Sequence, residues 1–215
     1  MTCKEFIDKL KLLRSEEPKI AKKKVFDLAK ESMQMQVNET IKLLRNTDYD
    51  CRLGAVSILD WKARSKKITE KEKEDIYNAY IENHKWIDEW GLVDRAAPYV
   101  VGGYLFDKDR SPLYSLAKSK FSMERRTAIV STYYFIRKNE TNDTFRLAEL
   151  LVQDKDEYVQ MAVGSWLREA GKKDISALKM FLDKYASIMH RKCLRYAIEK
   201  MDITSKQKYL NADKS

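Results

Sequence analysis

The sequence has little proline and glycine: 3 prolines and 6 glycines in 215 residues. These residues punctuate strands and tight turns, so their scarcity argues against a sandwich or barrel built from many hairpins. Cysteine and histidine are also few: Cys3, Cys51 and Cys193 lie far apart, and His84 and His190 are the only histidines. Three separated cysteines indicate no disulfide framework, and no Cys/His cluster has metal-ligand spacing. We therefore expect no metal and no cofactor.

Long apolar runs are missing as well. No stretch approaches the roughly 20 residues of a membrane span, and the N-terminus lacks the apolar core of a signal peptide. The odd number of cysteines fits a reducing compartment. From these absences we expect a cytoplasmic protein that does not enter a membrane.

Charge is abundant, and it is unbalanced. Charged residues make up 35% of the chain, and the formal net charge is +9. A basic protein of this kind suits a polyanion such as DNA, RNA or an anionic membrane, although a lysine-rich solvated face would give the same charge. Apolar residues reach 44%, enough for a continuous core.

Apolar residues recur with a period near 3.6 along most of the chain, which predicts an all-α fold. Turn and cap residues separate the segments, and the short connections favour antiparallel neighbours. The predicted helices cover residues 3–14, 18–33, 37–46, 50–65, 70–84, 91–105, 110–119, 122–138, 141–152, 156–170, 174–185, 190–201 and 204–210.

A weak internal repeat places alanine before a β-branched residue in several of these helices. The anchors are Ala55, Ala128, Ala162 and Ala197, with Ala96 as a further candidate. Their spacing of roughly 32 to 41 residues is typical of HEAT-like helical pairs. We therefore predict a superhelical solenoid of antiparallel helical pairs in one domain, residues 1–215. The alternative is a helical bundle without repeats.

Residues 86–106 form the densest unusual segment. Trp90 and Asp94 are four residues apart and share one helix face. An indole face and a carboxylate can together flank a developing positive charge. A core tryptophan and a capping or ion-paired aspartate would produce the same spacing. Arg95 adjoins Asp94, but it points elsewhere on a helix.

Two basic segments are candidates for DNA contacts. Arg125 and Arg126 stand near a predicted helix start, where guanidinium groups suit phosphate. Ser165 and Trp166, followed by Lys172, form a second group that can lie against a sugar-phosphate backbone. A solvated helix face and a packed tryptophan are the alternatives.

Three stretches resemble the AlkD type of DNA alkylation repair proteins, a family of bacterial HEAT-like-repeat DNA glycosylases. They are WGLVDRAAPYVVGGYL at 90–105, ERRTAIVST at 124–132 and LREAGK at 167–172. The resemblance runs from about residue 22 to residue 201. It implies a left-handed solenoid that cups double-stranded DNA in a basic groove. It also implies release of cationic N3- and N7-alkylpurines without base flipping.

By motif match, Trp90 and Asp94 would stand beside the sugar of the damaged nucleotide, and Arg126 would hold the backbone. The chain departs from the family pattern in two places. The family's second tryptophan falls at Ser165, with Trp166 one residue further along. The N-terminal region is also shortened between Leu13 and Val25.

Three hypotheses follow for function. The first is a metal-free alkylpurine DNA glycosylase, a monomer that associates with the bacterial nucleoid when bound to DNA. The second is a DNA-binding protein of the same fold with little or no catalysis, which recognises damaged or branched DNA. The third is a helical scaffold that binds proteins.

Overall fold

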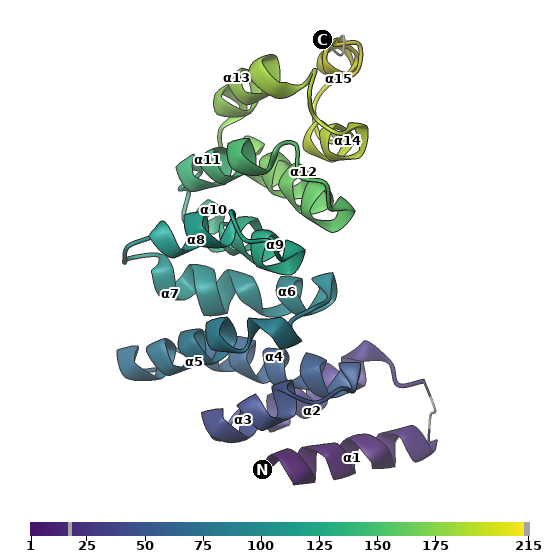
Figure 1. Ribbon diagram of the computed structural model, residues 1–215, viewed down its shortest axis with the longest axis vertical. Helices are drawn as coiled ribbons and strands as arrows, with labels where there is room; N and C mark the ends of the chain where they lie inside the picture. The colour runs from purple at the N-terminus through teal and green to yellow at the C-terminus, as the bar shows by residue number, and fades with distance from the viewer. Residues whose placement is uncertain (17–18, 213–215) are drawn as a thin grey trace. The chain divides into compact units, whose positions relative to one another are not determined.

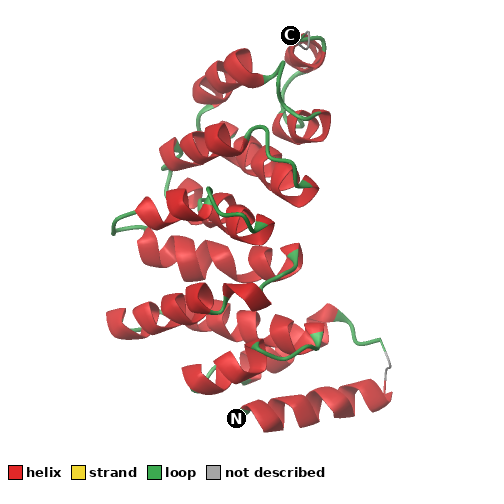
Figure 2. Cartoon of the chain, viewed as in Figure 1, coloured by secondary structure: helices red, strands yellow, loops and turns green. Residues whose placement is uncertain are grey.

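The computed structural model describes residues 1–16 and 19–212, and every regular element in these ranges is helical (Figure 2). The predicted all-α class is therefore confirmed. The chain divides into two compact units, residues 1–104 and residues 105–215. The single domain and the superhelical solenoid stay predictions.

The first unit is built around α4 (Tyr49–Ala63), which has ten buried residues in a row from Cys51 to Asp60. The helices α2 (Lys22–Glu31), α3 (Val37–Leu44), α5 (Glu70–Glu82) and α6 (Trp90–Ala97) pack against it, and α1 (Cys3–Glu16) packs against α3 (Figure 1). A short 3-10 turn at His84–Trp86 leads into α6. The π-helical turn Pro98–Gly102 and α7 (Gly103–Leu105) follow α6.

The second unit has α12 (Glu157–Gly171) at its centre. This helix packs against α9 (Ser122–Ser131), α11 (Asn142–Leu151), α13 (Ile175–Tyr185) and α14 (Arg191–Ala197). The remaining elements are α8 (Ser111–Leu116), which packs on α9, α10 (Tyr133–Arg137), and α15 (Ile203–Leu210), which packs on α14.

The repeat alanines lie where helices meet. Ala55 and Ala96 are fully buried on α4 and α6, which pack against each other. Ala128, Ala162 and Ala197 are at most 2% exposed on α9, α12 and α14, and α12 packs against both of the others. Small side chains at these places allow neighbouring helices to approach closely.

Two predicted helices are interrupted in the structure. Residues 91–105 include a π-helical turn at Pro98, because proline has no N–H and its ring crowds the carbonyl four residues earlier. Residues 122–138 divide at Thr132, whose hydroxyl donates to the carbonyl of Ile129 at 2.7 Å. The predicted start at Pro18 lies outside the described residues, and α2 begins at Lys22.

The same kind of side-chain-to-backbone hydrogen bond occurs at the first turn of three helices. The fourth residue of α4, α9 and α12 is Arg52, Arg125 and Gln160 respectively. Each donates from its side chain to the backbone carbonyl six residues earlier, at 3.3, 2.9 and 2.7 Å. These bonds give the part-buried carbonyls of the preceding loops a hydrogen-bond partner. The loops are thereby fixed to the helices that they introduce.

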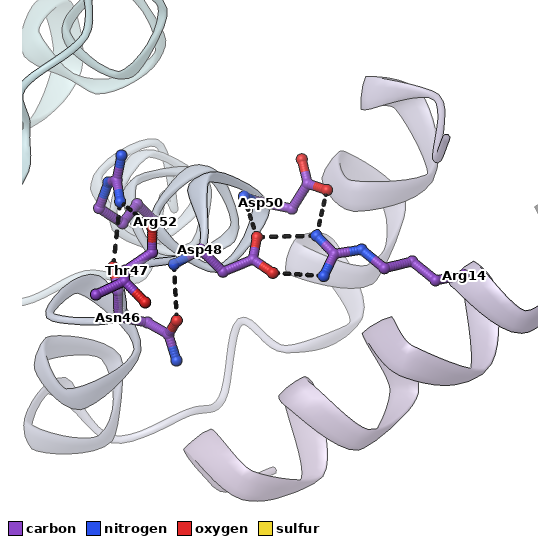
Figure 3. Close-up of polar contacts among 6 residues, drawn as sticks. All are labelled: Arg14, Asn46, Thr47, Asp48, Asp50 and Arg52. Carbon is purple, nitrogen blue, oxygen red and sulfur yellow. Dashed lines mark hydrogen bonds and ion pairs between the residues drawn. The ribbon is translucent and has the colours of Figure 1, made fainter. Parts of the chain in front are cut away.

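Arg14 joins α1 to the start of α4 (Figure 3). Its Nη2 donates to the carboxylates of Asp48 and Asp50 at 2.8 and 2.7 Å, and its Nη1 donates to the second oxygen of Asp48. Asp48 is also the N-cap of α4, accepting from the N–H of Asp50 at 2.9 Å. The hydrogen bonds from Arg14 lower the pKa of Asp48 below its ordinary value.

Because the folded state lowers the pKa of Asp48, this stabilisation is present above the unfolded value of about 4 and is lost as the pH falls below it. We expect Arg14→Gln to lower the melting temperature near neutral pH and to flatten its decline in acid. Thermal unfolding followed by circular dichroism between neutral and acid pH measures both. Lys11→Gln, on the same helix and in an exposed pair with Asp8, is the control. Equal acid dependence in all three proteins would contradict the assignment.

Gly164 lets α12 and α14 approach each other. A Cβ added there would lie 2.4 Å from the backbone oxygen of Cys193 and 2.7 Å from the Cβ of Tyr196. Backbone cannot yield as a flexible side chain can, so the two helices would have to separate.

We expect Gly164→Ala to lower the free energy of unfolding by about 1–3 kcal/mol, although alanine favours helix. Urea denaturation measures this change. Ser176→Ala, at an exposed site on α13, should change stability by less than about 0.5 kcal/mol. A Gly164→Ala protein as stable as the Ser176→Ala protein would show that the approach is not constrained.

Candidate functional site

Trp90 and Asp94 lie one turn apart on α6, as their spacing predicts. Trp90 is the first residue of the helix and is 44% exposed, while Asp94 is half-buried. The opposite face of α6 is anchored by buried Leu92, Val93 and Ala96. The amphipathic pattern therefore turns the indole and the carboxylate away from the core.

A cation already stands beside the Trp90 ring. The Lys22 Nζ, at the start of α2, lies 5.7 Å from the Trp90 ring centroid and 5.9 Å from that of Tyr49. A Cβ added to Gly91 would be 2.9 Å from the Tyr49 hydroxyl, so this phenol lies against the first turn of α6. Burial, aided by the charges of Glu89 and Asp50, raises the pKa of Tyr49 and keeps it neutral.

Sequence reasoning missed Lys22 and Tyr49. Tyr49 belongs to the polar turn at residues 47–50, but nothing in the spacing connects this turn to residue 90. The contact exists because α2 and α6 both pack against α4.

Arg95 is held inside the first unit. Its Nη1 lies 2.7 Å from the carboxylate of Asp60, and its Nε donates to the Ser57 hydroxyl at 3.0 Å. The guanidinium carbon lies 4.9 Å from the Phe26 ring centroid and 5.2 Å from that of Trp61. These partners already use much of the hydrogen-bonding capacity of the Arg95 guanidinium. A DNA contact by Arg95 stays a prediction.

Asp60 is a fully buried carboxylate shared by two arginines. Arg64 Nε donates to its second oxygen at 2.8 Å, one turn along α4. Burial raises the pKa of Asp60, and the charges of Arg95 and Arg64 act in the opposite direction. Burial and the nearby charge of Arg64 lower the pKa of Arg95, while Asp60 opposes this. The two arginines therefore offset part of the cost of burying this carboxyl group.

Arg125 and Arg126 also have internal partners. Arg125 forms a two-pronged pair with Asp154, at 2.5 and 2.9 Å, and this hydrogen bonding raises its pKa. Arg126 is buried, and its Nη1 donates to the backbone carbonyl of Tyr158. Their predicted phosphate contacts stay untested. The internal repeat carried a signal for Arg125, since Arg52 precedes Ala55 as Arg125 precedes Ala128.

Ser165 and Trp166 are both half-buried on α12. The indole of Trp166 stacks on Tyr133 of α10, with ring centroids 4.9 Å apart and an interplanar angle of 17°. Its Nε1 is buried and has no hydrogen-bond partner in the described part of the chain. Lys172 is exposed at the end of α12 and binds Glu169 at 2.7 Å. These residues lie in the second unit, as Arg125 and Arg126 do, whereas Trp90, Asp94 and Arg95 lie in the first.

The described residues offer no group of three or more His, Cys, Asp and Glu side chains placed to hold a metal ion. All three cysteines are free thiols, and burial raises the pKa of Cys51 and Cys193 to about 12. Among the helices in ranges 1–16 and 19–212, none has the length and apolarity to cross a membrane.

Comparison with known families identifies the kind of protein to which this helical fold and its Trp90–Asp94 face belong. A sequence model for the family described as DNA alkylation repair enzyme matches residues 15–201. The chain belongs to this family, whose substrate is DNA, and the predicted membership is confirmed. A comparison with curated proteins gives no match.

The Asp60 pair generates a stability prediction. Asp60→Asn leaves the largely buried Arg95 without a carboxylate, so we expect a loss of about 3 kcal/mol in the free energy of unfolding. Urea denaturation measures the loss. Asp75→Asn, which removes the same charge from an exposed pair with Lys71, should cost at most about 1 kcal/mol. Similar losses in the two variants would refute the structural role of the pair.

Proposed function

We propose that this protein is a DNA glycosylase that releases cationic N3- and N7-alkylpurines from duplex DNA without base flipping. The observation that carries the proposal is the Lys22 ammonium 5.7 Å from the exposed Trp90 ring, with Asp94 one turn away on the same face. A surface that accepts a lysine cation also suits a cationic base. Family membership supplies DNA as the substrate.

The chemistry needs little from the protein. An alkylated purine carries a positive charge, so the N-glycosidic bond breaks with its electron pair going to the base, which leaves neutral. The sugar becomes an oxocarbenium-like cation at C1′. Water then adds its oxygen to C1′ and loses a proton, which gives an abasic site.

The proposed role of Asp94 is to stabilise the sugar cation and orient the attacking water. At about 4 Å and an effective dielectric constant near 20, Coulomb attraction is roughly 4 kcal/mol. This corresponds to about three decades in rate if it is fully realised in the transition state. Trp90 would supply an apolar, electron-rich wall beside the same nucleotide.

A second candidate is DNA binding with little or no base release. The stacking of Trp166 on Tyr133 favours it, because that indole is committed to packing inside its unit. Ser165 stands where the family resemblance expects a second aromatic wall. Such a protein would recognise damaged or branched DNA and leave the glycosidic bond intact.

The test is base release under single-turnover conditions from duplexes containing N7-methylguanine or N3-methyladenine. We expect wild-type protein to release free base, and Asp94→Asn to lower the rate by about three decades because the carboxylate charge is lost. Asp75→Asn makes the same substitution in the ion pair with Lys71 and should retain the wild-type rate.

Salt-dependent duplex binding by wild-type protein without base release would reject the glycosylase and support the second candidate. Equal base release by Asp94→Asn and wild-type protein would remove Asp94 from the mechanism. Melting temperatures and duplex affinities of each variant separate these results from misfolding.

A further inference from the structure

Three cations surround one tryptophan in the first unit. The Lys30 Nζ lies 5.3 Å from the Trp61 ring centroid, and the guanidinium carbons of Arg95 and Arg64 lie at 5.2 and 6.0 Å. The Arg64 guanidinium also stacks 3.7 Å from the ring centroid of Tyr99. These residues come from α2, α4, α6 and the π-helical turn, so packing of the whole unit brings them together.

Lys30 and Arg64 are the outer members of this cluster. Lys30 is exposed, and the Arg64 side chain is 36% exposed, against 16% for Arg95. Both are absent from the predicted site residues, which came from helices further along the chain.

The positive charge of the cluster exceeds its negative charge. Asp60 is the carboxylate of this cluster, and it pairs with two of the three cations, Arg64 and Arg95. The two acids of α2 are paired elsewhere, Asp27 with Lys23 at 2.7 Å and Glu31 with Lys9 at 3.7 Å. Lys30 and Arg64 also lie at helix C-termini, each equivalent to about half a negative charge. A net positive charge remains after both are counted.

The Arg64 guanidinium has hydrogen-bond donors that its internal contacts do not use. Its Nε is used by Asp60, while its two outer nitrogens have no hydrogen-bond or ion-pair partner among the residues that the structure describes. Stacking on Tyr99 occupies a face of the guanidinium, and the N–H donors point outward in its plane. Two parallel N–H groups match the oxygens of a phosphate.

We propose that Lys30 and Arg64 form a binding site for a backbone phosphate of duplex DNA, with Trp61 and Tyr99 as its floor and Asp60 fixing Arg64. This inference rests on the DNA binding in the proposed function, but not on base release. The exposed lysine would supply the longer-range attraction, and the stacked arginine would supply directional hydrogen bonds.

The first test compares two lysines of α2. Lys30→Ala removes a proposed phosphate contact, and Lys23→Ala removes a lysine paired with Asp27. Loss of one contact should reduce the slope of log affinity against log salt by about 0.9, which is about eight-fold in affinity near 0.1 M salt. Fluorescence anisotropy with an undamaged labelled duplex measures both, and Lys23→Ala should match wild-type protein.

The second test locates the phosphate. A single neutral methylphosphonate is moved along each strand, and wild-type affinity should fall at one or two linkages. In Lys30→Ala and Arg64→Ala, the methylphosphonate at that linkage should cause no further loss of affinity. The amino-acid substitution has then already removed the contact that the methylphosphonate would remove. Lys30→Ala keeps this test valid if Arg64→Ala unfolds.

Unchanged slope and affinity in Lys30→Ala, or a methylphosphonate profile identical to that of wild-type protein, would overturn the proposal. Lys30 and Arg64 would then contact the Trp61 ring without binding a phosphate. Because the duplex is undamaged, this result is independent of base release: a protein that binds duplex DNA without releasing base fails as a glycosylase while its phosphate site remains testable.

Discussion

The hydrogen bonds that close the first turns of α4, α9 and α12 fix the loops on which both units depend. Each comes from the fourth residue of the helix and reaches a carbonyl six residues back. The charged donors of Arg52 and Arg125 make such a bond worth about 1.5–3 kcal/mol, and the neutral amide of Gln160 makes it worth about 0.5–1.5 kcal/mol. These bonds constrain the direction in which the chain enters each helix. Close approaches such as that at Gly164 tolerate little error in that direction, so packing and loop geometry depend on the same bonds.

This dependence explains why the helices could be predicted from the sequence. A 3.6-residue period and polar caps are local signals, and they located most helices to within a few residues. The two interruptions had local causes that periodicity does not register. Pro98 lacks the N–H that its helix needs, and Thr132 bonds back to Ile129. The recurring alanines marked helices that pack together, because a small side chain at a helix contact lets the two helices approach closely.

The site was only partly predictable, for a physical reason. Helical spacing put Trp90 and Asp94 on one face, and α6 has them there. Whether an arginine is held inside the protein or faces solvent depends on acceptors far away in sequence. Asp154 is 29 residues from Arg125 and the Tyr158 carbonyl is 32 from Arg126. A guanidinium that finds an internal acceptor resembles one that faces DNA when only the sequence is read. Lys22 and Lys30 lacked any motif, and the packing of α2 places them beside Trp90 and Trp61.

Arg95 links the buried Asp60 ion pair to Asp94, the residue with the proposed chemical role. It is adjacent to Asp94 on a short helix, so fixing the direction of one side chain fixes that of the other. A carboxylate that stabilises a sugar cation must be held within about 0.5 Å and 10–20° of its productive geometry. Besides its hydrophobic packing, α6 is held by the ion pair of Arg95 with buried Asp60 and by its bond to Ser57, which constrain the rotation of the helix. A buried ion pair contributes little net stability. This ion pair instead constrains the orientation of Arg95, and the same carboxylate accepts a hydrogen bond from Arg64 Nε at the C-terminal end of α4. One buried charge thus organises both the proposed chemistry at Asp94 and the proposed phosphate contact at Arg64.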